Sequence, residues 1–554
     1  MKYYLNFLGC LLFSLGSSIA HADDVKPVVT TKYGKLAGET STIDKRVKVF
    51  RGIPFAAPPI GKHRWAPPIS PTSWKGIRQA TEFSPQCLQQ TEGIAGFIQN
   101  IYQGMGVPKA DWPKIDNVKS SEDCLYLNIW SKKLTDKQPV MVWIHGGGHQ
   151  TGSGASANYE GTQLGLKGVV LVTVNYRLNV FGYFAHPALS KASDQGVSGN
   201  YGLLDNIAAL RWVQENIAAF GGDPDNVTIF GESAGGTSVL QLVASPLAKG
   251  LFHKAISQSG TLHQMSHVSN NAQGWEPSME SRGEQLAKKL SLENPTTEAL
   301  RALPAEQVVE ASTDLSFQPT IDGWSLPVPV AQIFAEGKQN AVPLMIGSNA
   351  NEGSILYWNA PHIDMPPVQD LASYREHLSR IFGDKVSAID ALYPIQNEGE
   401  LHLTGRDMLG DSLFGAPARY AAGHMKNVKQ PAYLYFFSRT PPGRAATRLG
   451  AYHAAEIPFV FDTHAPVFEI TEADKKLTGI MGLYWVNFAK SGDPNIFILP
   501  KWTPYSQSDE KYMEFSNTTA KMAPVERGSA YDLLDQAMLN KLAKFPESMP
   551  KSGK

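Results

Sequence analysis

Short apolar runs that end in glycine-rich or polar turns recur along this chain of 554 residues. They are rich in β-branched and aromatic residues and alternate little with polar ones, which is typical of strands buried on both faces of a parallel sheet. The runs lie at residues 139–144, 169–175, 227–230 and 431–437. Two earlier runs, at residues 28–33 and 47–51, predict an N-terminal hairpin.

Helical spacing of apolar residues appears between these strands. The segment 203–219 has such spacing at Leu204, Ile207, Leu210 and Val213, and glycines followed by a proline come directly after it. A late helix is expected at 477–490, and the stretches 273–304 and 361–425 are helical but more polar. Strands that alternate with helices predict an α/β fold with a large, mostly parallel central sheet flanked by helices.

The most informative motif is Gly231-Glu232-Ser233-Ala234-Gly235, which joins the apolar run at 227–230 to a stretch of small and apolar residues. A serine at the apex of a sharp turn from strand to helix is the nucleophile elbow of an α/β-hydrolase. A side chain two positions before or after the serine would clash with the strand or the helix, which explains both glycines. The first N–H groups of the helix then face the site where negative charge develops.

A second motif, His145-Gly146-Gly147-Gly148, ends the apolar run at 139–144. A glycine run at a strand end could be a flexible turn. Upstream of a nucleophile elbow it has a specific role, because backbone without side chains lets N–H groups approach the carbonyl oxygen of an ester. Ala234, directly after the serine, supplies a further N–H. The two motifs in this order predict hydrolase chemistry.

A nucleophilic serine needs a base, and the base needs a carboxylate that fixes its tautomer. In α/β-hydrolases the acid and then the histidine follow the serine along the chain. Glu352 lies in a polar turn directly after a short apolar strand and is the candidate acid, although an exposed turn glutamate would have the same pattern. Among the histidines that follow, His453 lies in a loop of small residues that would let an imidazole enter a crowded site. The others are His362, His377, His402, His424 and His464.

These motifs resemble those of type-B carboxylesterases, the carboxylesterase/cholinesterase family. The resemblance extends from about Lys26 to about Leu542. It rests on FRGIPFA at 50–56, SEDCLYLNI at 121–129, HGGG at 145–148, GESAG at 231–235, NEG at 351–353 and GAYH at 450–453. The family implies an α/β-hydrolase fold, ester hydrolysis and no metal or organic cofactor. We interpret the polar helical stretches as insertions over the catalytic face.

The resemblance also implies a role for each matching residue. Ser233 is expected to be the nucleophile, His453 the general base and acid, and Glu352 the acid that orients it. The oxyanion-hole donors correspond to Gly147, Gly148 and Ala234. Polar positions beside the triad correspond to Glu232, Ser259 and Glu456.

Some positions depart from the cholinesterase pattern. Aromatic side chains that narrow the acyl pocket and form a cage for quaternary ammonium groups are replaced by Thr313, Leu315, Ile355 and Leu356. A tryptophan near the second loop cysteine corresponds to Trp112 only with a longer spacing. Choline esters are therefore not the expected substrate. His149 stands where Phe or Ala is commoner, and the sequence does not indicate what this ring does.

The N-terminus has the features of a signal peptide. Lys2 precedes an apolar stretch at 5–19, and Ala20-His21-Ala22 is a small-x-small cleavage pattern. We expect cleavage after Ala22, a single mature domain at 23–554 without a transmembrane segment, and export to the periplasm or the medium. A retained anchor, or lipoprotein processing at Cys10, is a less favoured alternative.

Composition agrees with an exported enzyme. Once the leader is removed, only Cys87 and Cys124 remain; in an oxidising compartment such a pair forms a disulfide, and two free thiols are the alternative. The loop between them would border the active-site entrance, where Phe97, Tyr102 and Trp112 either line the entrance or pin the loop. The formal net charge of −1 gives no indication of nucleic-acid binding.

Three other functions share these features. A lipase or an amidase would use the same triad, and a non-catalytic adhesion protein could use the same fold. Adhesion members of the family lack part of the triad, whereas all three residues are present here. The predicted partner is therefore a small-molecule ester, and the sequence does not indicate which one or the oligomeric state.

Overall fold

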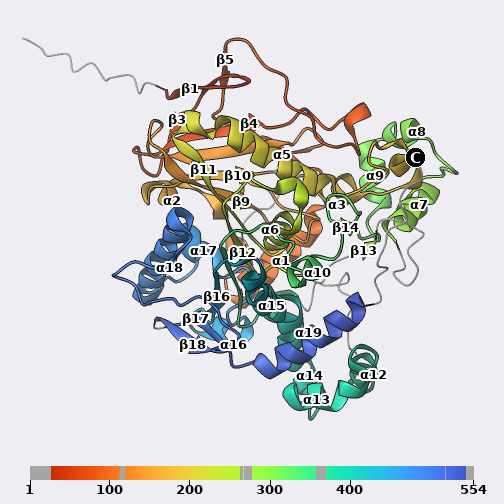
Figure 1. Cartoon of the computed structure of the whole chain (residues 1–554), viewed down its shortest axis with the longest axis vertical. Helices are drawn as coiled ribbons and strands as arrows, with labels where there is room; N and C mark the ends of the chain where they lie inside the picture. Colours follow the sequence, from red (N-terminus) through yellow and green to blue (C-terminus); the bar gives the residue numbers. More distant parts are fainter. Residues whose placement is uncertain are drawn as a thin grey trace, which may run out of the picture.

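A large mixed sheet forms the centre of the computed structural model, which describes residues 26–112, 119–262, 266–267, 278–356, 370–517 and 519–543 (Figure 1). From edge to edge its strands are β18 (Ala520–Pro524), β17 (Lys511–Phe515), β16 (Ala432–Phe437), β15 (Leu344–Asn349), β12 (Lys254–Gln258), β11 (Gly222–Glu232), β9 (Gln138–Ile144), β10 (Val170–Val174), β8 (Tyr126–Ser131), β4 (Lys48–Pro54) and β3 (Glu39–Thr40). The strands from β17 to β10 run parallel, and the outer pairs are antiparallel. The predicted mostly parallel sheet is confirmed.

Side chains of successive residues in β9 enter two different hydrophobic cores. Val140, Val142 and Ile144 belong to one cluster, whereas Met141 and Trp143 belong to the other. The first core is covered by α5 (Tyr201–Asn216) and α6 (Ala234–Ala244), and the second by α18 (Glu472–Ser491). Because both faces are buried, the strands read as continuous apolar runs rather than alternating ones.

The predicted central helix and strand are confirmed with shifted ends. Helix α5 begins two residues before the predicted start and continues as a 3-10 turn, Ile217–Phe220. It ends at Gly221, whose φ of +78° places it in the left-handed region. Strand β11 then begins at Gly222, earlier than the apolar run indicates.

The pairing predicted for the N-terminal hairpin is wrong. Strand β1 (Val28–Thr31) pairs with β2 (Gly34–Ala37), which pairs in turn with β5 (Ile77–Gln79), in a small separate sheet. The run at 47–51 lies instead in β4, next to β8 in the main sheet. The Thr31 hydroxyl accepts a hydrogen bond from the amide of Gly34, so the tight turn gives β1 a nearer partner. The apolar side chains of β4 are fully buried only in the main sheet.

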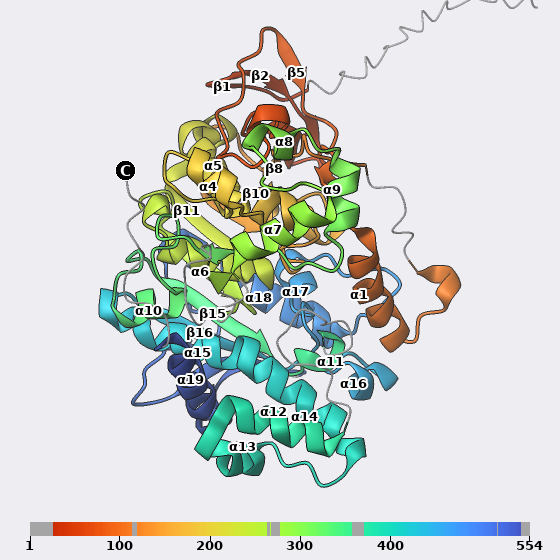
Figure 2. The same ribbon diagram turned by 90° about the vertical axis from the view of Figure 1, so that its right-hand side faces the viewer.

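Two groups of helices come from the predicted insertions. The first contains α7 (Met279–Lys289) and α8 (Thr297–Arg301) and is followed by α9 (Ala305–Ala311); residues 273–277 lie outside the described residues. The second contains α12 (Leu371–Phe382), α13 (Val386–Leu392), α14 (Glu398–Gly410), a π-helix at Asp411–Gly415 and α15 (Ala416–His424). Figure 2 shows α12–α14 at one end of the molecule and the sheet of β1, β2 and β5 at the other.

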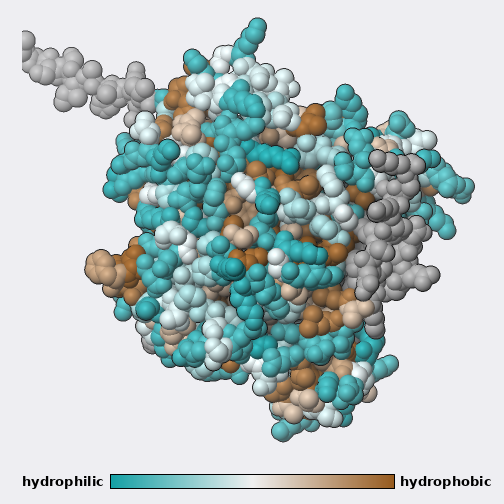
Figure 3. Space-filling model, viewed as in Figure 1, coloured by the Kyte–Doolittle hydropathy of each residue, from teal (hydrophilic) through white to brown (hydrophobic). Residues whose placement is uncertain are grey.

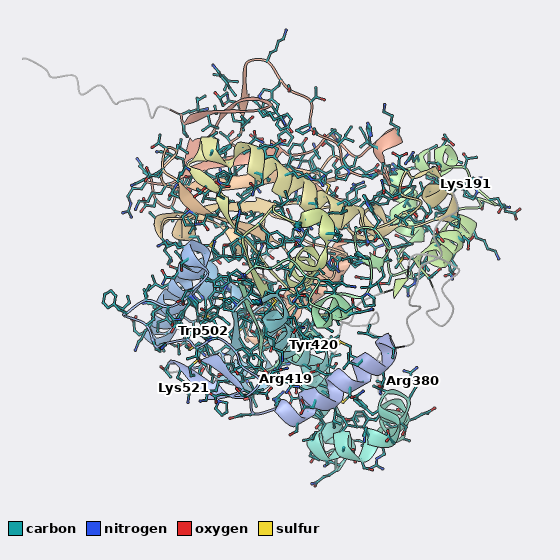
Figure 4. All side chains as sticks on the ribbon, viewed as in Figure 1. Lys191, Arg380, Arg419, Tyr420, Trp502 and Lys521 are labelled. Carbon is teal, nitrogen blue, oxygen red and sulfur yellow. A yellow bond between two sulfur atoms is a disulfide. The ribbon has the colours of Figure 1, made fainter. Side chains whose placement is uncertain are left out.

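The C-terminal helix α19 (Gly528–Leu542) packs on this second group. Arg419, labelled in Figure 4 where α15 meets α19, forms ion pairs with Asp532 and with Asp535, the latter at 3.1 Å. The face of the molecule in Figure 3 is mostly hydrophilic and is broken by small apolar areas. Within the described residues, no helix combines the length and the apolar character needed to cross a membrane.

The predicted disulfide between Cys87 and Cys124 is present, with the two Cα atoms 4.9 Å apart. It closes the loop that carries helix α1 (Thr91–Gly104). The predicted signal peptide, residues 1–22, lies outside the described residues and stays a prediction.

Candidate active site

Ser233 lies at the junction of β11 and α6. Its backbone has φ +57° and ψ −124°, a strained conformation for a residue with a side chain. A Cβ on Gly235 would lie 2.0 Å from the carbonyl oxygen of Ile144, and one on Gly231 would lie 2.5 Å from the same oxygen. The expectation that side chains at these two positions would clash is confirmed. The glycines let β11, α6 and β9 approach so closely that the turn at the serine cannot relax.

The glycine motif at 145–148 follows β9, the neighbour of β11 in the sheet. Gly147 and Gly148 have positive φ angles of 107° and 65°, and a Cβ on Gly147 would lie 2.2 Å from the carbonyl oxygen of Thr151. A Cβ built on Gly146 would lie 3.1 Å from the Cβ of Ser233. The structure therefore brings this loop to the nucleophile elbow, and the residues predicted as oxyanion donors lie at the carboxyl ends of two neighbouring strands.

Polar contacts fix the loop from both sides. The His149 ring is fully buried, and its Nε2 lies 3.1 Å from the hydroxyl of Ser238 in α6. From the opposite direction, Gln318 donates a hydrogen bond of 3.1 Å from Nε2 to the carbonyl oxygen of Gly148. Burial lowers the pKa of His149 to about 4, so the ring is neutral at pH 7. His149, whose role the sequence did not indicate, ties the glycine loop to α6.

Glu352 follows β15 and is almost completely buried. Its Oε1 accepts hydrogen bonds from the Ser259 hydroxyl at 2.6 Å and from the Asn349 amide at 2.7 Å. Its Oε2 lies 2.6 Å from Nδ1 of His453. One carboxylate oxygen is therefore held by the scaffold, and the other is directed at the imidazole.

The loop that carries His453 is attached to the turn of Glu352. Asn351 donates its amide to the carbonyl oxygen of Ala451 at 2.9 Å, and its side chain accepts the Ala451 amide at 3.0 Å. Gly450 lies so close that a Cβ there would be 2.1 Å from the Asn351 side-chain oxygen. The small residues noted in the sequence are thus needed for this contact, which brings together acid and base 101 positions apart.

The second imidazole nitrogen is not bonded to the serine. Among the described residues His453 Nε2 has no hydrogen-bond partner, and it lies 3.2 Å from Oε1 of Glu232. The structure thus joins Glu352 to His453 and places Glu232 beside Nε2, but it does not join His453 to the Ser233 hydroxyl. Such contacts are often loose without substrate and tighten when it binds.

A buried network joins Glu456, one of the polar positions expected beside the triad, to Gln258, Asn349 and Trp485, which the sequence did not single out. Glu456, fully buried, accepts hydrogen bonds from Gln258 at 3.0 Å and from the Asn349 side chain at 2.6 Å. Gln258 also accepts the indole N–H of Trp485 at 2.9 Å, and its carbonyl oxygen accepts the Ser233 amide at 2.8 Å. The signal available for Gln258 and Asn349 was their position at the ends of β12 and β15, where polar residues of parallel strands converge.

Comparisons with known proteins agree with this architecture. The profile of the carboxylesterase family matches residues 25–533. The chain belongs to the carboxylesterase family. It is 36% identical over 525 residues to fumonisin B1 esterase of Sphingopyxis macrogoltabida, covering 90% of this chain and 89% of that protein. It is 34% identical over 499 residues to para-nitrobenzyl esterase of Bacillus subtilis, covering 87% of this chain and 93% of that protein.

The solved structure of a PNB esterase has the same fold. It superimposes with a TM-score of 0.75 at 31% identity, and the match covers 92% of this chain and all of that one. The chain is therefore a carboxylic ester hydrolase with the α/β-hydrolase fold. In the ranges that the structure describes, no group of three His, Cys, Asp or Glu side chains could hold a metal ion.

Three buried glutamates surround the imidazole of this carboxylesterase. Burial raises the pKa of Glu232, with the charge of His453 opposing the shift and the charges of Glu456 and Glu352 adding to it. Burial alone would lower the pKa of His453, but the carboxylates of Glu232 and Glu352 outweigh it, and the pKa is raised. Glu232 and His453 therefore influence each other's charge at a distance of 3.2 Å.

Aromatic side chains pack around the imidazole on two sides. The ring of Phe414, from the π-helix, stacks on His453 with centroids 4.8 Å apart and an interplanar angle of 24°. Phe97 of α1 presents a perpendicular ring at 6.4 Å. Of the three aromatics in the disulfide loop, Phe97 thus reaches the site, while Tyr102 packs on Phe468 and the Trp112 indole donates to the backbone of its own loop. Phe414 gave no sequence signal, because no local motif marks it.

The second insertion therefore covers part of the site. Gly410, at the end of α14, lies so close to Glu352 that a Cβ there would be 3.0 Å from the Glu352 Cβ. Helix α11 (Gly353–Leu356), which carries Ile355, packs on α14. The first insertion reaches the glycine loop only indirectly, since Arg282 of α7 donates to the carbonyl oxygen of Ser316, two residues before Gln318.

Proposed function

We propose that this carboxylesterase hydrolyses its ester in two steps through an acyl-enzyme on Ser233. The proposal is carried by the contact of 2.6 Å between Glu352 and His453, beside a serine held in a strained turn. A carboxylate at Nδ1 keeps the proton on that nitrogen, so Nε2 is free to act as the base.

In the first step His453 removes the proton of Ser233 as the hydroxyl oxygen attacks the ester carbonyl. The oxyanion forms against the N–H groups of Gly147, Gly148 and Ala234, and His453 then gives its proton to the leaving alcohol. In the second step a water molecule gives a proton to His453 and attacks the carbonyl carbon of the acyl-enzyme. The bond to the Ser233 oxygen then breaks, His453 returns the proton to that oxygen, and the carboxylic acid is released. Each oxyanion donor is expected to contribute about 3–4 kcal/mol of transition-state stabilisation.

Two aliphatic side chains, at positions that are aromatic in the cholinesterase pattern, indicate the substrate class. Ile355 is buried and Leu315 is half-buried, where a cholinesterase pattern would have aromatic rings. We therefore propose a neutral carboxylic ester rather than a choline ester. Export is part of the proposal: it is supported by the leader-like segment at 1–22 and by the disulfide, which forms in oxidising compartments. N-terminal sequencing of the mature protein should find Asp23 first.

Replacement of the nucleophile tests the mechanism. Ser233→Ala should lower kcat for a short p-nitrophenyl ester by about 10⁴-fold or more and abolish labelling by a fluorophosphonate. Ser245→Ala is the matched control, because the hydroxyl of this buried serine donates to the carbonyl oxygen of Ser325 and accepts the Leu247 amide, two residues that have no proposed role in the site. Retained turnover in Ser233→Ala, or labelling of another residue in the wild type, would overturn the proposal. Comparison of an ester with its matching amide then distinguishes an esterase from an amidase.

A further inference from the structure

We propose that Phe414 is a positioning residue that holds the plane of the His453 imidazole, and that helix α19 holds Phe414 in place through the ion pair of Arg527 with Asp411. The inference rests on the proposed role of His453 as the base. It adds a part of the molecule far from the triad to the machinery that orients it.

The imidazole needs a second constraint. Its bond to Glu352 fixes Nδ1 at 2.6 Å, but rotation about that contact would still swing Nε2 between neighbouring acceptors. One such neighbour, Glu232, lies 3.2 Å away, and Ser233 is the next residue along the chain. A ring stacked at 4.8 Å and nearly parallel to the imidazole opposes this rotation. The perpendicular ring of Phe97 approaches the imidazole as well.

The segment that carries Phe414 is a π-helix, Asp411–Gly415, between α14 and α15. Such segments insert an extra residue into a helix and re-aim its side chains, and they occur often at functional sites. Gly410 before it packs against Glu352. Gly415 at its other end packs on α19, where a Cβ would lie 2.5 Å from the Tyr531 hydroxyl oxygen. The π-helix and Gly410 before it thus contact the acid, the base and the C-terminal helix within residues 410–415.

Asp411 fixes the start of the π-helix. The residue is 4% exposed, and its carboxylate accepts the Tyr393 hydroxyl at 2.6 Å and the Arg527 guanidinium at 2.9 Å. The Tyr531 hydroxyl donates to it at 3.3 Å. Arg527 immediately precedes α19, and the same helix is bound to α15 through Asp535 and Arg419 at 3.1 Å (Figure 4). Ion pairs of Arg527 and Arg419 therefore hold α19 against residues on either side of Phe414, Asp411 before it and Arg419 after it.

Phe414→Leu tests the inference, because leucine fills most of the space without a planar ring. The readouts are kcat and KM for a short p-nitrophenyl ester, with kcat expressed per site labelled by a fluorophosphonate. We expect kcat to fall about tenfold with KM within about twofold of wild type, since only the orientation of the base changes. Phe414→Tyr, which keeps the ring, should restore kcat.

Two further variants separate positioning from general destabilisation. Phe382→Leu is the matched control, since this buried phenylalanine of α12 lies in the core cluster under the insertion. Its kcat per labelled site should equal that of the wild type. Tyr393→Phe removes one hydrogen bond to Asp411 and should lower kcat by about twofold while KM stays unchanged. This variant tests the inference even if Phe414→Leu does not fold.

The inference is wrong if Phe414→Leu matches Phe382→Leu in kcat per labelled site, or if only KM changes. It is equally wrong if Phe414→Tyr stays as slow as the leucine variant. These results differ from a failure of the proposed function, in which Ser233 of the wild type would not be labelled at all.

Discussion

The two sides of Ser233, the proposed nucleophile, are built in different ways. On the oxyanion side, the backbone groups of the proposed donors Gly147, Gly148 and Ala234 lie on turns whose shape is enforced by glycines and positive φ angles. On the base side, the parts are the side chains of Glu352 and His453, with Phe414 packed on the imidazole, and they come from three separate segments. The first side is a property of local backbone, and the second is a property of packing.

The difference explains how tolerant each side should be. A backbone donor cannot be removed by changing its own side chain, so the oxyanion side fails only when an added atom forces the chain to move. A side-chain relay fails when one hydrogen-bonding atom is exchanged, even though the fold is kept. Isosteric substitutions should therefore lower kcat when they are made on the base side, and they should have little effect on kcat when they are made on the oxyanion side.

Glu352→Gln should have the largest effect. The Gln oxygen can keep the bonds from Ser259 and the Asn349 amide, so its NH₂ group would face Nδ1 of His453. The imidazole must then carry its proton on Nε2 and cannot accept the serine proton. We expect kcat to fall by about 10³–10⁴-fold with little change in thermal stability. Glu456→Gln, which alters a buried glutamate that bonds to Gln258 and Asn349 rather than to the imidazole, should lose far less activity. Equal losses would mean that charge, not the tautomer, decides activity.

Gly235→Ala tests the oxyanion side. The new methyl group would lie 2.0 Å from the Ile144 carbonyl oxygen, so α6 must shift and carry the Ala234 amide with it. We expect kcat to fall at least about 100-fold and the free energy of unfolding to fall by about 3 kcal/mol. Gly168→Ala, at φ +88° with open space around the Cβ, should cost about 1 kcal/mol and leave kcat unchanged. Denaturant unfolding and ester turnover measure both quantities, and similar activities would show that the elbow is not rigid.

Glu232→Gln should have the smallest effect and act on the pH profile. The carboxylate of Glu232 favours the charged imidazole and raises the pKa of His453. Without that charge the pKa falls, the neutral base persists to lower pH, and the acid limb of kcat/KM should move down by about one pH unit. Glu456, whose charge has a weaker effect on His453, should give a smaller shift in the same direction when changed to Gln. An acid limb that moves to higher pH would contradict the assignment.

Prediction from sequence succeeded where geometry is local. The sequence predicts that side chains at Gly231 and Gly235 would clash, and the close approach of both glycines to Ile144 confirms it. The sequence also predicts that the small residues before His453 make room for its imidazole; the structure shows a different need for Gly450, which allows the close contact with Asn351. Prediction from sequence failed where a strand could pair with more than one neighbour. The run at 47–51 pairs with β8 rather than with the first strand.

The sequence by itself determined the family and the class of fold and predicted the residues of the site, because strained turns and close backbone approaches permit few residue types at fixed spacing. Only the tertiary structure decided that Gln258 meets Glu456 across 198 positions and that Phe414 stacks on His453. Contacts of that kind depend on how distant segments pack, and packing leaves no periodic or spaced pattern in the chain.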